Sequence, residues 1–432
     1  HMNSSRASII FLGDLVCFII SLFIMIGFET HGAFDNNLIG NYSRAFLIPG
    51  VLTLIIFYVL DLYDTKYSIP TPRTIGRFII GAVMTSVVYA LFFYLFPKFG
   101  ISPKTNLVIF SIVFIGLTMV WRRTFFHLFA KTFARKIAFI GTDKEIEDLK
   151  TGLKEHRHIG TNIGTFETFE SYENSNLHAD VLVVAKVIGI QNTHKIAKIK
   201  TPVMTTLGAF EEMFAKTPLS LISPEEGFLM ASRNDEGGWY FLYRGFEIFI
   251  ASLVLIITSP LSIIAIVSRL IEDGSPIFIR QKRIGKNGTI FTLYKFRSMK
   301  ALAPDGSAEI SGAQWAEKQD PRITPVGKIL RKTHIDEIPQ MWNIICGDLA
   351  LVGPRAERPE FVEKLEKEIP YYNIRHSVKP GFTGWAQIKY RYARTVDDSR
   401  EKLEYDLYYL RYKNPLLDLG ILTKTIQIIF TH

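Results

Sequence analysis

Four long apolar runs in the first third of the chain constrain its fold more than any other feature. They cover residues 9–28, 45–60, 78–96 and 107–121. Each approaches the roughly 20 residues that an α-helix needs to cross the hydrocarbon core of a bilayer. The runs have aromatic ends and basic flanks, which favours membrane-spanning helices over helices buried in a large soluble core. The mean hydropathy of the chain, +0.17, also favours a membrane protein.

The charges between these runs predict the orientation of a four-helix transmembrane region, residues 8–123. The first loop is nearly neutral, whereas the second loop and the tail after the fourth run are rich in Lys and Arg. By the positive-inside rule, both ends of the region then face the cytoplasm, with the third loop as a mild exception. We do not expect the first run to be a cleaved signal peptide, because a polar segment follows it instead of a small-residue cleavage site.

Composition limits the compartment and the partners. The net charge of +9 suits anionic lipid headgroups, nucleic acid or phosphorylated substrates. The two cysteines, Cys17 and Cys346, do not make a disulfide framework and suit a reducing compartment.

Residues 136–232 carry the alternating pattern of a small, Rossmann-like α/β domain with a parallel sheet. Short buried-strand patterns cover residues 136–141 and 180–185, and a polar, helix-like stretch lies between them at 143–156. The turn after the first strand, Gly141-Thr142-Asp143, has one glycine where a dinucleotide fingerprint needs three. We therefore favour a structural or regulatory module over a cofactor-binding domain.

A fifth apolar run, residues 246–267, opens the last part of the chain, residues 240–432. Ser259-Pro260 lies in its middle, and proline bends a helix because it removes a hydrogen bond and clashes with the preceding turn. Both flanks of the run are basic, which a spanning helix should not be. We expect a re-entrant helix that enters and leaves on the cytoplasmic face; the alternative is a proline-kinked spanning helix.

The remaining residues predict an α/β domain of short strands and amphipathic helices. Strands are expected at residues 277–280, 291–293 and 384–389, and helical spacing of apolar residues covers 335–345 and 403–410. Residues 416–430 are apolar but short and lysine-bearing, so we expect them to lie at the membrane interface.

The candidate chemistry lies in residues 333–355. Asp336 and Glu337 form an acidic pair within an apolar, amphipathic segment, and Arg355 follows a Gly-Pro turn. A carboxylate nucleophile, a carboxylate that can hold Mg²⁺ and an arginine fork are the groups that phosphoryl transfer needs. The alternative is a helix N-terminus with acids in its first turn, where they stabilise the helix dipole.

Two basic groups flank this pair in the sequence. Lys295 and Arg297 suit phosphate binding as a point charge and a fork, or they form an exposed basic strand edge. Arg375, His376 and Lys379 suit nucleotide or lipid-phosphate binding, or simple headgroup attraction. His376 as a general base is the weaker idea, since a histidine beside an arginine is more often a structural donor.

Trp385 follows this second basic group. It suits either stacking on a uracil ring or anchoring at the membrane interface.

Several of these motifs occur in a fixed order. They are Ser259-Pro260, residues 294–299 (YKFRSM), Asp336-Glu337, Gly347-Asp348, Gly353-Pro354-Arg355 and residues 379–387 (KPGFTGWAQ). In this order they resemble the catalytic domain of the polyprenyl-phosphate hexose-1-phosphate transferases, the bacterial sugar transferase or phosphoglycosyl transferase family. With the preceding helices and α/β domain, the chain resembles the large, polytopic members.

The resemblance implies a membrane phosphotransferase, of EC 2.7.8 type, that moves a sugar-1-phosphate from a UDP-sugar to undecaprenyl phosphate and releases UMP. It implies Asp336 as the covalent nucleophile, Glu337 as a Mg²⁺ ligand and Arg355 at the substrate phosphates. Ala356 stands where the family motif Pro-Arg-Pro has its second proline, so the loop is expected to be less rigid. The product would begin an exopolysaccharide, a capsule or an O-antigen.

The resemblance also implies a multi-pass protein of the bacterial inner membrane, with its soluble domains and active site on the cytoplasmic side. The expected partners are the UDP-sugar, undecaprenyl phosphate and the phospholipid bilayer, with no nucleic acid. The hexose, the pathway and any ligand of the middle domain stay open. The oligomeric state also stays open, although helix bundles of this size often form homodimers.

Two other functions compete with this one. A membrane receptor or scaffold would use the middle domain as a sensor, but it leaves Asp336-Glu337 and the paired basic groups unexplained. A membrane-tethered sugar-nucleotide dehydratase or epimerase would need a dinucleotide site, against which the single glycine at Gly141 speaks.

Overall fold

The chain forms two compact units in a computed structural model, His1–Ala209 and Phe210–His432, which we describe separately. The structure describes residues 2–29, 36–60, 62–63, 72–95, 103–129, 135–155, 159–186, 188, 193–197, 199, 201–232, 240–301, 320–390 and 395–430.

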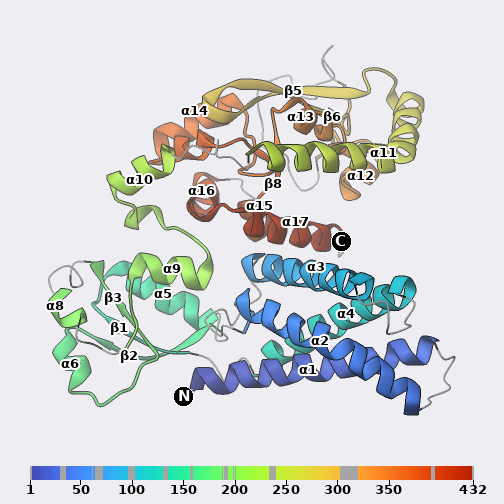
Figure 1. The fold of residues 1–432 in the computed structure, drawn as a ribbon. Coiled ribbons are helices and arrows are strands. Elements are labelled where there is room, and N and C mark those ends of the chain that lie inside the picture. The colour runs from blue at the N-terminus through green and yellow to red at the C-terminus, as the bar shows by residue number, and fades with distance from the viewer. Residues whose placement is uncertain are drawn as a thin grey trace. The chain divides into compact units, whose positions relative to one another are not determined.

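The first unit begins with four long helices (Figure 1). They are α1 (Met2–Glu29), α2 (Asn36–Val59), α3 (Pro72–Leu95) and α4 (Pro103–Phe129). Each contains a stretch of 18 to 21 residues that is long and apolar enough to cross a membrane. This agrees with the four apolar runs in the sequence. Large apolar side chains such as Leu12, Leu47 and Tyr94 stay exposed on these helices, as expected of surfaces that face lipid.

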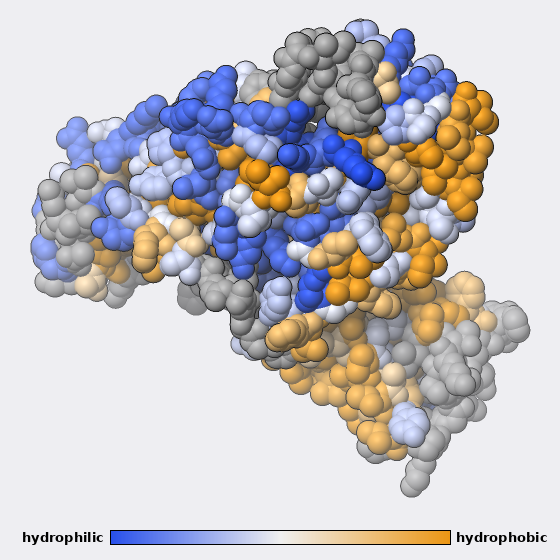
Figure 2. Space-filling view, turned by 90° about the horizontal axis from the view of Figure 1, so that it is seen from above, coloured by the Kyte–Doolittle hydropathy of each residue, from blue (hydrophilic) through white to orange (hydrophobic). Residues whose placement is uncertain are grey.

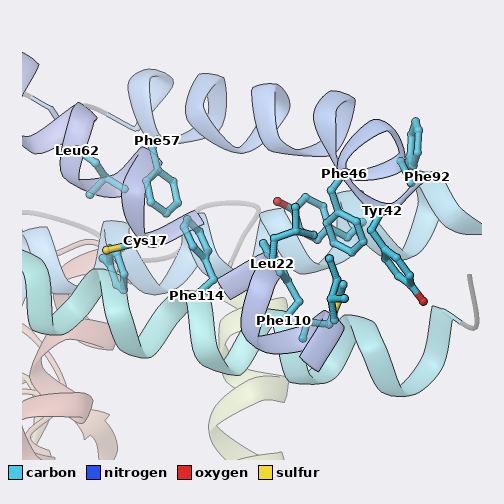
Figure 3. Packing of buried hydrophobic residues seen from close by; sticks show 14 of the residues in the cluster. Cys17, Leu22, Tyr42, Phe46, Phe57, Leu62, Phe92, Phe110 and Phe114 are labelled. Atoms are coloured by element: carbon cyan, nitrogen blue, oxygen red, sulfur yellow. The ribbon is translucent and has the colours of Figure 1, made fainter. Parts of the chain in front are cut away.

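Aromatic side chains fill the interior of this bundle. Phe46 and Phe57 of α2 point toward Phe110 and Phe114 of α4 (Figure 3). The rings of Phe46 and Phe110 lie 5.0 Å apart, and those of Phe57 and Phe114 lie 6.1 Å apart. Aromatic rings at these separations attract each other beyond the area that they bury.

A buried ion pair joins the first helix of the bundle to the last. Asp14 of α1 is fully buried and accepts a hydrogen bond from Nε of Arg122 in α4, at 3.3 Å. Nη1 of the same guanidinium donates to the carbonyl of Leu62, just after α2, at 2.9 Å. Because a charge in an apolar interior is costly without a partner, this pair fixes which ends of the three segments meet.

The first unit also contains a four-stranded parallel sheet, in the order β2-β1-β3-β4. The strands are β1 (Arg135–Ile140), β2 (Gly160–Phe166), β3 (Val181–Val184) and β4 (Val203–Thr205), and the helices are α5 (Lys144–Glu155), α6 (Phe169–Glu173), α8 (Thr193–Ile196) and α9 (Thr206–Phe214). The predicted strands at 136–141 and 180–185 and the helix at 143–156 are confirmed as β1, β3 and α5.

Packing explains the single glycine of this domain's first turn. Gly141 has a φ of 117°, and a Cβ there would lie 2.6 Å from the Cβ of Ala185. The backbone therefore needs glycine at this position whether or not a ligand binds.

The second unit begins with residues of α9 and then η2 (Leu219–Leu221) and α10 (Pro224–Ala231). Its longest element is α11 (Tyr240–Asp273), a 34-residue helix that stays helical through Pro260 and bends within its length (Figure 1). Pro260 cannot donate to the carbonyl of Ile256, and the hydroxyl of Ser259 donates to that carbonyl instead, at 2.8 Å. The Ser-Pro pair thus bends the helix without leaving that carbonyl unpaired.

Both ends of α11 are tied to the same unit. Near its start, Arg244 donates to the carbonyls of Ile344 and Ile345, and Glu247 accepts from the backbone N–H of Leu351 at 2.9 Å. Near its end, Arg269 donates to the hydroxyl of Thr324 at 2.7 Å.

The middle of α11 is largely exposed and apolar. The exposed side chains around the bend are Ile256, Ile257, Leu261, Ile263 and Ile264. Figure 2 shows hydrophobic residues gathered in continuous patches beside a mostly hydrophilic surface. An exposed apolar stretch between two anchored ends is what a membrane-inserted hairpin requires.

The rest of the second unit is built from short elements. An antiparallel hairpin pairs β5 (Phe278–Ile284) with β6 (Ile290–Phe296), and β7 (Ala350–Val352) runs parallel to β8 (Gly381–Thr383). The helices are α12 (Pro325–Lys332), α13 (Gln340–Cys346), α14 (Pro359–Glu368), α15 (Trp385–Lys389), α16 (Val396–Tyr412) and α17 (Pro415–Phe430), with one-turn segments η3 (Lys286–Gly288) and η4 (Ile335–Glu337) and the longer η5 (Tyr372–Ser377).

These elements confirm part of the prediction and correct the rest. The strands expected at 277–280 and 291–293 lie in β5 and β6, and the helix expected at 403–410 lies in α16. The strand expected at 384–389 is wrong, because the strand β8 ends at Thr383 and those residues form α15. The helix expected at 335–345 is divided into η4 and α13 at Pro339, which opens the second of the two.

Candidate active site

Asp336 and Glu337 lie on a turn of their own between two helices. α12 ends at Lys332, and His334 takes a left-handed conformation with a φ of 56° that reverses the chain. The 3₁₀ turn Ile335–Glu337 follows, and α13 begins after Pro339. Left-handed conformations are uncommon outside glycine and cluster at functional sites, so this turn is built at some cost in backbone strain.

Two cations from other parts of the sequence face Glu337. Nζ of Lys295, on β6, lies 2.8 Å from Oε1 of Glu337, and Nη2 of Arg355, after β7, lies 3.5 Å from the same oxygen. Burial disfavours the charged carboxylate, but Lys295 and Arg355 outweigh it and hold the pKa of Glu337 far below its ordinary range. Glu337 is therefore ionised at every physiological pH.

Asp336 has the opposite environment. Its side chain is buried, and burial together with the neighbouring negative charge of Glu337 raises the pKa of Asp336 to about 6, against the opposing charges of Lys295, Arg331 and His334. Adjacent carboxyls whose environments separate their pKa values are typical of sites where the two groups have different chemical roles.

Three glycines place the loop that carries Arg355. A Cβ on Gly381 would lie 2.0 Å from the backbone nitrogen of Gly353, and a Cβ on Gly384 would lie 2.1 Å from the carbonyl oxygen of Gly353. The backbones also pair directly, since Gly381 N–H donates to the carbonyl of Pro354 at 2.9 Å. Close backbone contact of this kind is possible only for glycine, which gives a physical reason for both glycine motifs.

Ala356, which stands where the family motif has its second proline, is held in place by a hydrogen bond. Nη1 of Arg283, on β5, donates to the carbonyl of Ala356 at 3.0 Å, and Ala356 is buried. A hydrogen bond from the hairpin therefore restrains the loop where a proline ring would have restrained it.

Arg375 holds the backbone of Arg355 in place. Its guanidinium is buried, forms an ion pair with Asp406 of α16 at 2.8 Å, and donates to the carbonyl of Arg355 at 3.1 Å. The predicted contact of Arg375 with a nucleotide or lipid phosphate is thus not what this structure shows, because protein groups already surround the side chain.

The environment of His376 also disfavours the predicted role as a general base. Burial and the adjacent charge of Arg375 lower the pKa of His376 to about 3, so the ring is neutral at physiological pH and a poor base.

The structure separates Arg297 from Lys295. β6 ends at Phe296, and the guanidinium of Arg297 is fully buried, donating to the carbonyls of Asp273 and Gly274 at the end of α11. Arginine commonly caps the last carbonyls of a helix in this way. The structure therefore brings Lys295, but not Arg297, to the acidic pair.

Lys379 and Trp385 also lie apart from the pair. Nζ of Lys379 lies 3.5 Å from the hydroxyl of Tyr240, at the start of α11. Trp385 is 2% exposed and donates its indole N–H to the carbonyl of Ala215 at 2.8 Å. It is a core residue here, so neither uracil stacking nor anchoring at the membrane surface fits its position.

Two buried polar residues that position the site were missed in the sequence. Asn343 accepts from the N–H of Tyr294 at 3.1 Å and donates to the carbonyl of Thr292 at 2.7 Å, which fixes β6 against α13 next to Lys295. Glu247 holds α11 to β7. In the sequence, each is a lone polar side chain on the apolar face of its segment. This pattern could have predicted that each makes a buried hydrogen bond.

The residues present suit Mg²⁺ to a limited degree. Within the described ranges, no three or more His, Cys, Asp or Glu side chains gather in one place. Mg²⁺ often uses only one or two carboxylates and completes its shell with substrate phosphates and water, however, and Asp336 and Glu337 can supply those carboxylates.

Comparison with known proteins shows that residues 239–432 match the bacterial sugar transferase family. A UDP-N-acetylgalactosamine-undecaprenyl-phosphate N-acetylgalactosaminephosphotransferase of Aeromonas hydrophila is 42% identical over 191 residues, 44% of each chain. The exopolysaccharide production protein PSS of Rhizobium leguminosarum is 34% identical over 192 residues, which are 43% of this chain and 93% of that protein.

A third similarity extends over most of the chain. An undecaprenyl-phosphate glucose phosphotransferase of Komagataeibacter xylinus is 24% identical over 420 residues, 89% of this chain and 77% of that one. The chain belongs to the bacterial sugar transferase family. It matches less than half the length of several of its curated relatives, such as the Aeromonas enzyme.

Replacing Asp406 with Asn should test the buried support of Arg355. The change keeps the shape of the side chain but removes the carboxylate that lies 2.8 Å from the buried guanidinium of Arg375, so the free energy of unfolding should fall by about 3–5 kcal/mol. Denaturant unfolding in detergent measures this. Glu363→Gln, which breaks the exposed pair of Glu363 with Lys367, is the control and should unfold like the unmodified protein. An equally small effect of both changes would contradict the proposed support.

Proposed function

We propose that this protein transfers a sugar-1-phosphate from a UDP-sugar to undecaprenyl phosphate and releases UMP, beginning the assembly of a surface polysaccharide. The observation that carries the proposal is the pair Asp336-Glu337, in which two cations hold one carboxylate ionised while the other lies beside it with a raised pKa. Two relatives, a UDP-N-acetylgalactosamine-undecaprenyl-phosphate N-acetylgalactosaminephosphotransferase and a UDP-glucose:undecaprenyl-phosphate glucose-1-phosphate transferase, support the same class of reaction.

The reaction proceeds in two displacements. The ionised carboxylate of Asp336 attacks the β-phosphorus of the UDP-sugar, a bond forms between the two, and the bond to the bridging oxygen breaks so that UMP leaves. A phosphate oxygen of undecaprenyl phosphate then attacks the same phosphorus, and the aspartyl bond breaks. The carboxylate of Asp336 is regenerated and the lipid carries the sugar diphosphate.

The residues around Asp336 have distinct roles in this scheme. Arg355 is partly exposed and faces the pair, so it can stabilise the charge that develops on the transferring phosphoryl group. Lys295 and Glu337 form an ion pair at 2.8 Å, and an incoming diphosphate can share the charge of Lys295. Glu337 would be the residue that holds Mg²⁺, and the ion would supply positive charge against the diphosphate of the substrate.

A covalent intermediate suits the location of the two substrates. The donor is soluble and the acceptor lies in the bilayer, and a relay through Asp336 lets them react at different times. We place the active site on the cytoplasmic side of the inner membrane, with α1–α4 spanning it. α11 would be re-entrant, because both of its ends are held by one unit while its apolar middle is exposed.

The competing functions have less support. A receptor or scaffold gives no role to the opposed charges of Glu337, Lys295 and Arg355. A sugar-nucleotide dehydratase or epimerase would need a glycine-rich turn that binds a dinucleotide. The one glycine of this turn, Gly141, is already explained by its packing against Ala185.

Cysteine labelling tests the course of α11. Leu242 and Ile271 are both exposed and lie near opposite ends of the helix. With Cys17 and Cys346 replaced by Ser, single cysteines at 242 and 271 should react with a membrane-impermeant maleimide only after permeabilisation. Labelling of position 271 from outside intact spheroplasts, with position 242 protected, would show a spanning helix instead.

Replacing Asp336 with Asn should abolish both net transfer and the exchange of labelled UMP into UDP-sugar without lipid. Glu337→Gln should lower the rate by roughly 10²-fold, the scale for losing one electrostatic catalytic group. The assay is UMP release from a panel of UDP-sugars with undecaprenyl phosphate. Exchange that persists in Asp336→Asn, with no sugar-phosphate adduct on residue 336 of the unmodified protein by mass spectrometry, would rule out the relay.

The pH dependence follows from the raised pKa of Asp336. Only the ionised carboxylate attacks, so the rate constant for the initial burst of UMP release from limiting UDP-sugar should be constant above pH 7 and should fall about tenfold per pH unit below pH 6. Glu337 should add no second acid limb, since its pKa lies far below this range. Measuring this burst without lipid and without added UMP removes the titration of both phosphate monoesters from the profile. A profile that stays flat down to pH 4.5 would contradict the role assigned to Asp336.

A further inference from the structure

Residues 210–231, which we call the strap, precede the sugar transferase domain but belong to the same compact unit. The match to the bacterial sugar transferase family begins at residue 239, whereas the second unit begins at Phe210. The predicted boundary of the middle domain, at 232, assigned the strap to the other domain. In the structure the strap packs with the second unit instead, and its contacts explain why.

Polar contacts hold the strap along α16. Nζ of Lys216 lies 2.7 Å from Glu401 and 2.9 Å from Glu404. The backbone N–H of Thr217 donates to the carbonyl of Glu404, and that of Leu219 donates to its carboxylate, both at 3.0 Å. A single residue of α16, Glu404, thus contacts three residues of the strap, Lys216, Thr217 and Leu219.

Further contacts secure both ends of the strap. Near its start, Glu211 accepts from the hydroxyl of Tyr412 at 2.7 Å, and near its end Glu226 pairs with Arg411 at 3.1 Å. Ile222 and Met230 are buried in one apolar cluster with Leu403, Leu407 and Leu410 of α16. Buried apolar area and part-buried ion pairs together make this an integral packing surface and not a loose linker.

One contact leads from the strap to the candidate active site. The carbonyl of Ala215 accepts the indole N–H of Trp385 at 2.8 Å, and both residues are buried. Trp385 directly follows Gly384, whose Cα packs against the carbonyl of Gly353. Gly353 in turn donates its N–H to Thr383 at 2.9 Å and lies two residues before Arg355.

We propose that the strap is a positioning element of the active site: through Ala215 and Trp385 it fixes β8 and the glycine contacts that set the place of Arg355. The transferase unit of this chain then begins near residue 210. The proposal rests on the proposed function for its catalytic effect, although its structural part does not. A small displacement of a charged group at a reacting phosphate can lower the rate strongly without weakening substrate binding to the same extent.

Substitution of Lys216 in the full chain tests the proposal. Lys216→Met keeps an apolar stem and removes the ion pairs with Glu401 and Glu404, and Lys150→Met is the control, since it removes the pair of Lys150 with Glu147 in the first unit. We expect Lys216→Met to lower kcat for UMP release by about tenfold with KM changed less than about twofold. Lys150→Met should match the unmodified protein.

Hydrogen exchange supplies a readout that does not need activity. Amides of residues 381–389 should exchange at least about tenfold faster in Lys216→Met than in Lys150→Met. Trp385→Phe, which keeps an aromatic ring but leaves the carbonyl of Ala215 without its donor, should show the same loss of kcat and the same faster exchange.

The outcomes separate the two proposals. An inactive unmodified protein, with faster exchange of residues 381–389 in Lys216→Met, would overturn the transferase function and support the strap's hold on the loop. An active protein in which Lys216→Met and Trp385→Phe both keep the unmodified kcat and exchange rates would overturn the strap.

Discussion

The ionised carboxylate of Glu337 is the contact on which the arrangement of the candidate site depends. It lies on a one-turn segment, and its two cations come from the β5–β6 hairpin and from the loop after β7. Each of these segments is held in its own way: the buried Asn343 fixes β6, close backbone contact of three glycines and the buried Arg375 fix the loop of Arg355, and the left-handed conformation of His334 sets the turn. The strained turn and the close backbone packing thus both position the cluster of Glu337, Lys295 and Arg355.

The sequence predicts those parts of the structure that depend on local pattern. The apolar runs, the parallel strands around Gly141 and the hairpin that contains Lys295 follow from periodicity and length. The roles of Arg297, Arg375 and Trp385 could not be read in the same way, because each is decided by a distant partner: the end of α11, Asp406 and Ala215. Asp336 and Glu337 were found from residue type and motif order, whereas the difference between their pKa values depends on the fold.

The Ser259-Pro260 pair of α11 has two structural roles. Pro260 bends the helix, and Ser259 supplies the hydrogen bond that the proline removes. The bend would allow both anchors, at Arg244 and Arg269, to reach the same unit. The residues that follow this second anchor, Asp273 and Gly274, accept hydrogen bonds from Arg297, so the course of α11 also fixes where β6, and with it Lys295, ends.

The ion pair of Asp14 with Arg122 joins residues that are 108 positions apart in the chain. At a synthesis rate of about 5–20 residues per second, the carboxylate of α1 leaves the ribosome roughly 5–20 s before its guanidinium partner does. During that interval Asp14 lacks the cation that it is paired with in the finished bundle. The contact that joins α1 to α4 can therefore form only after α4 has been made.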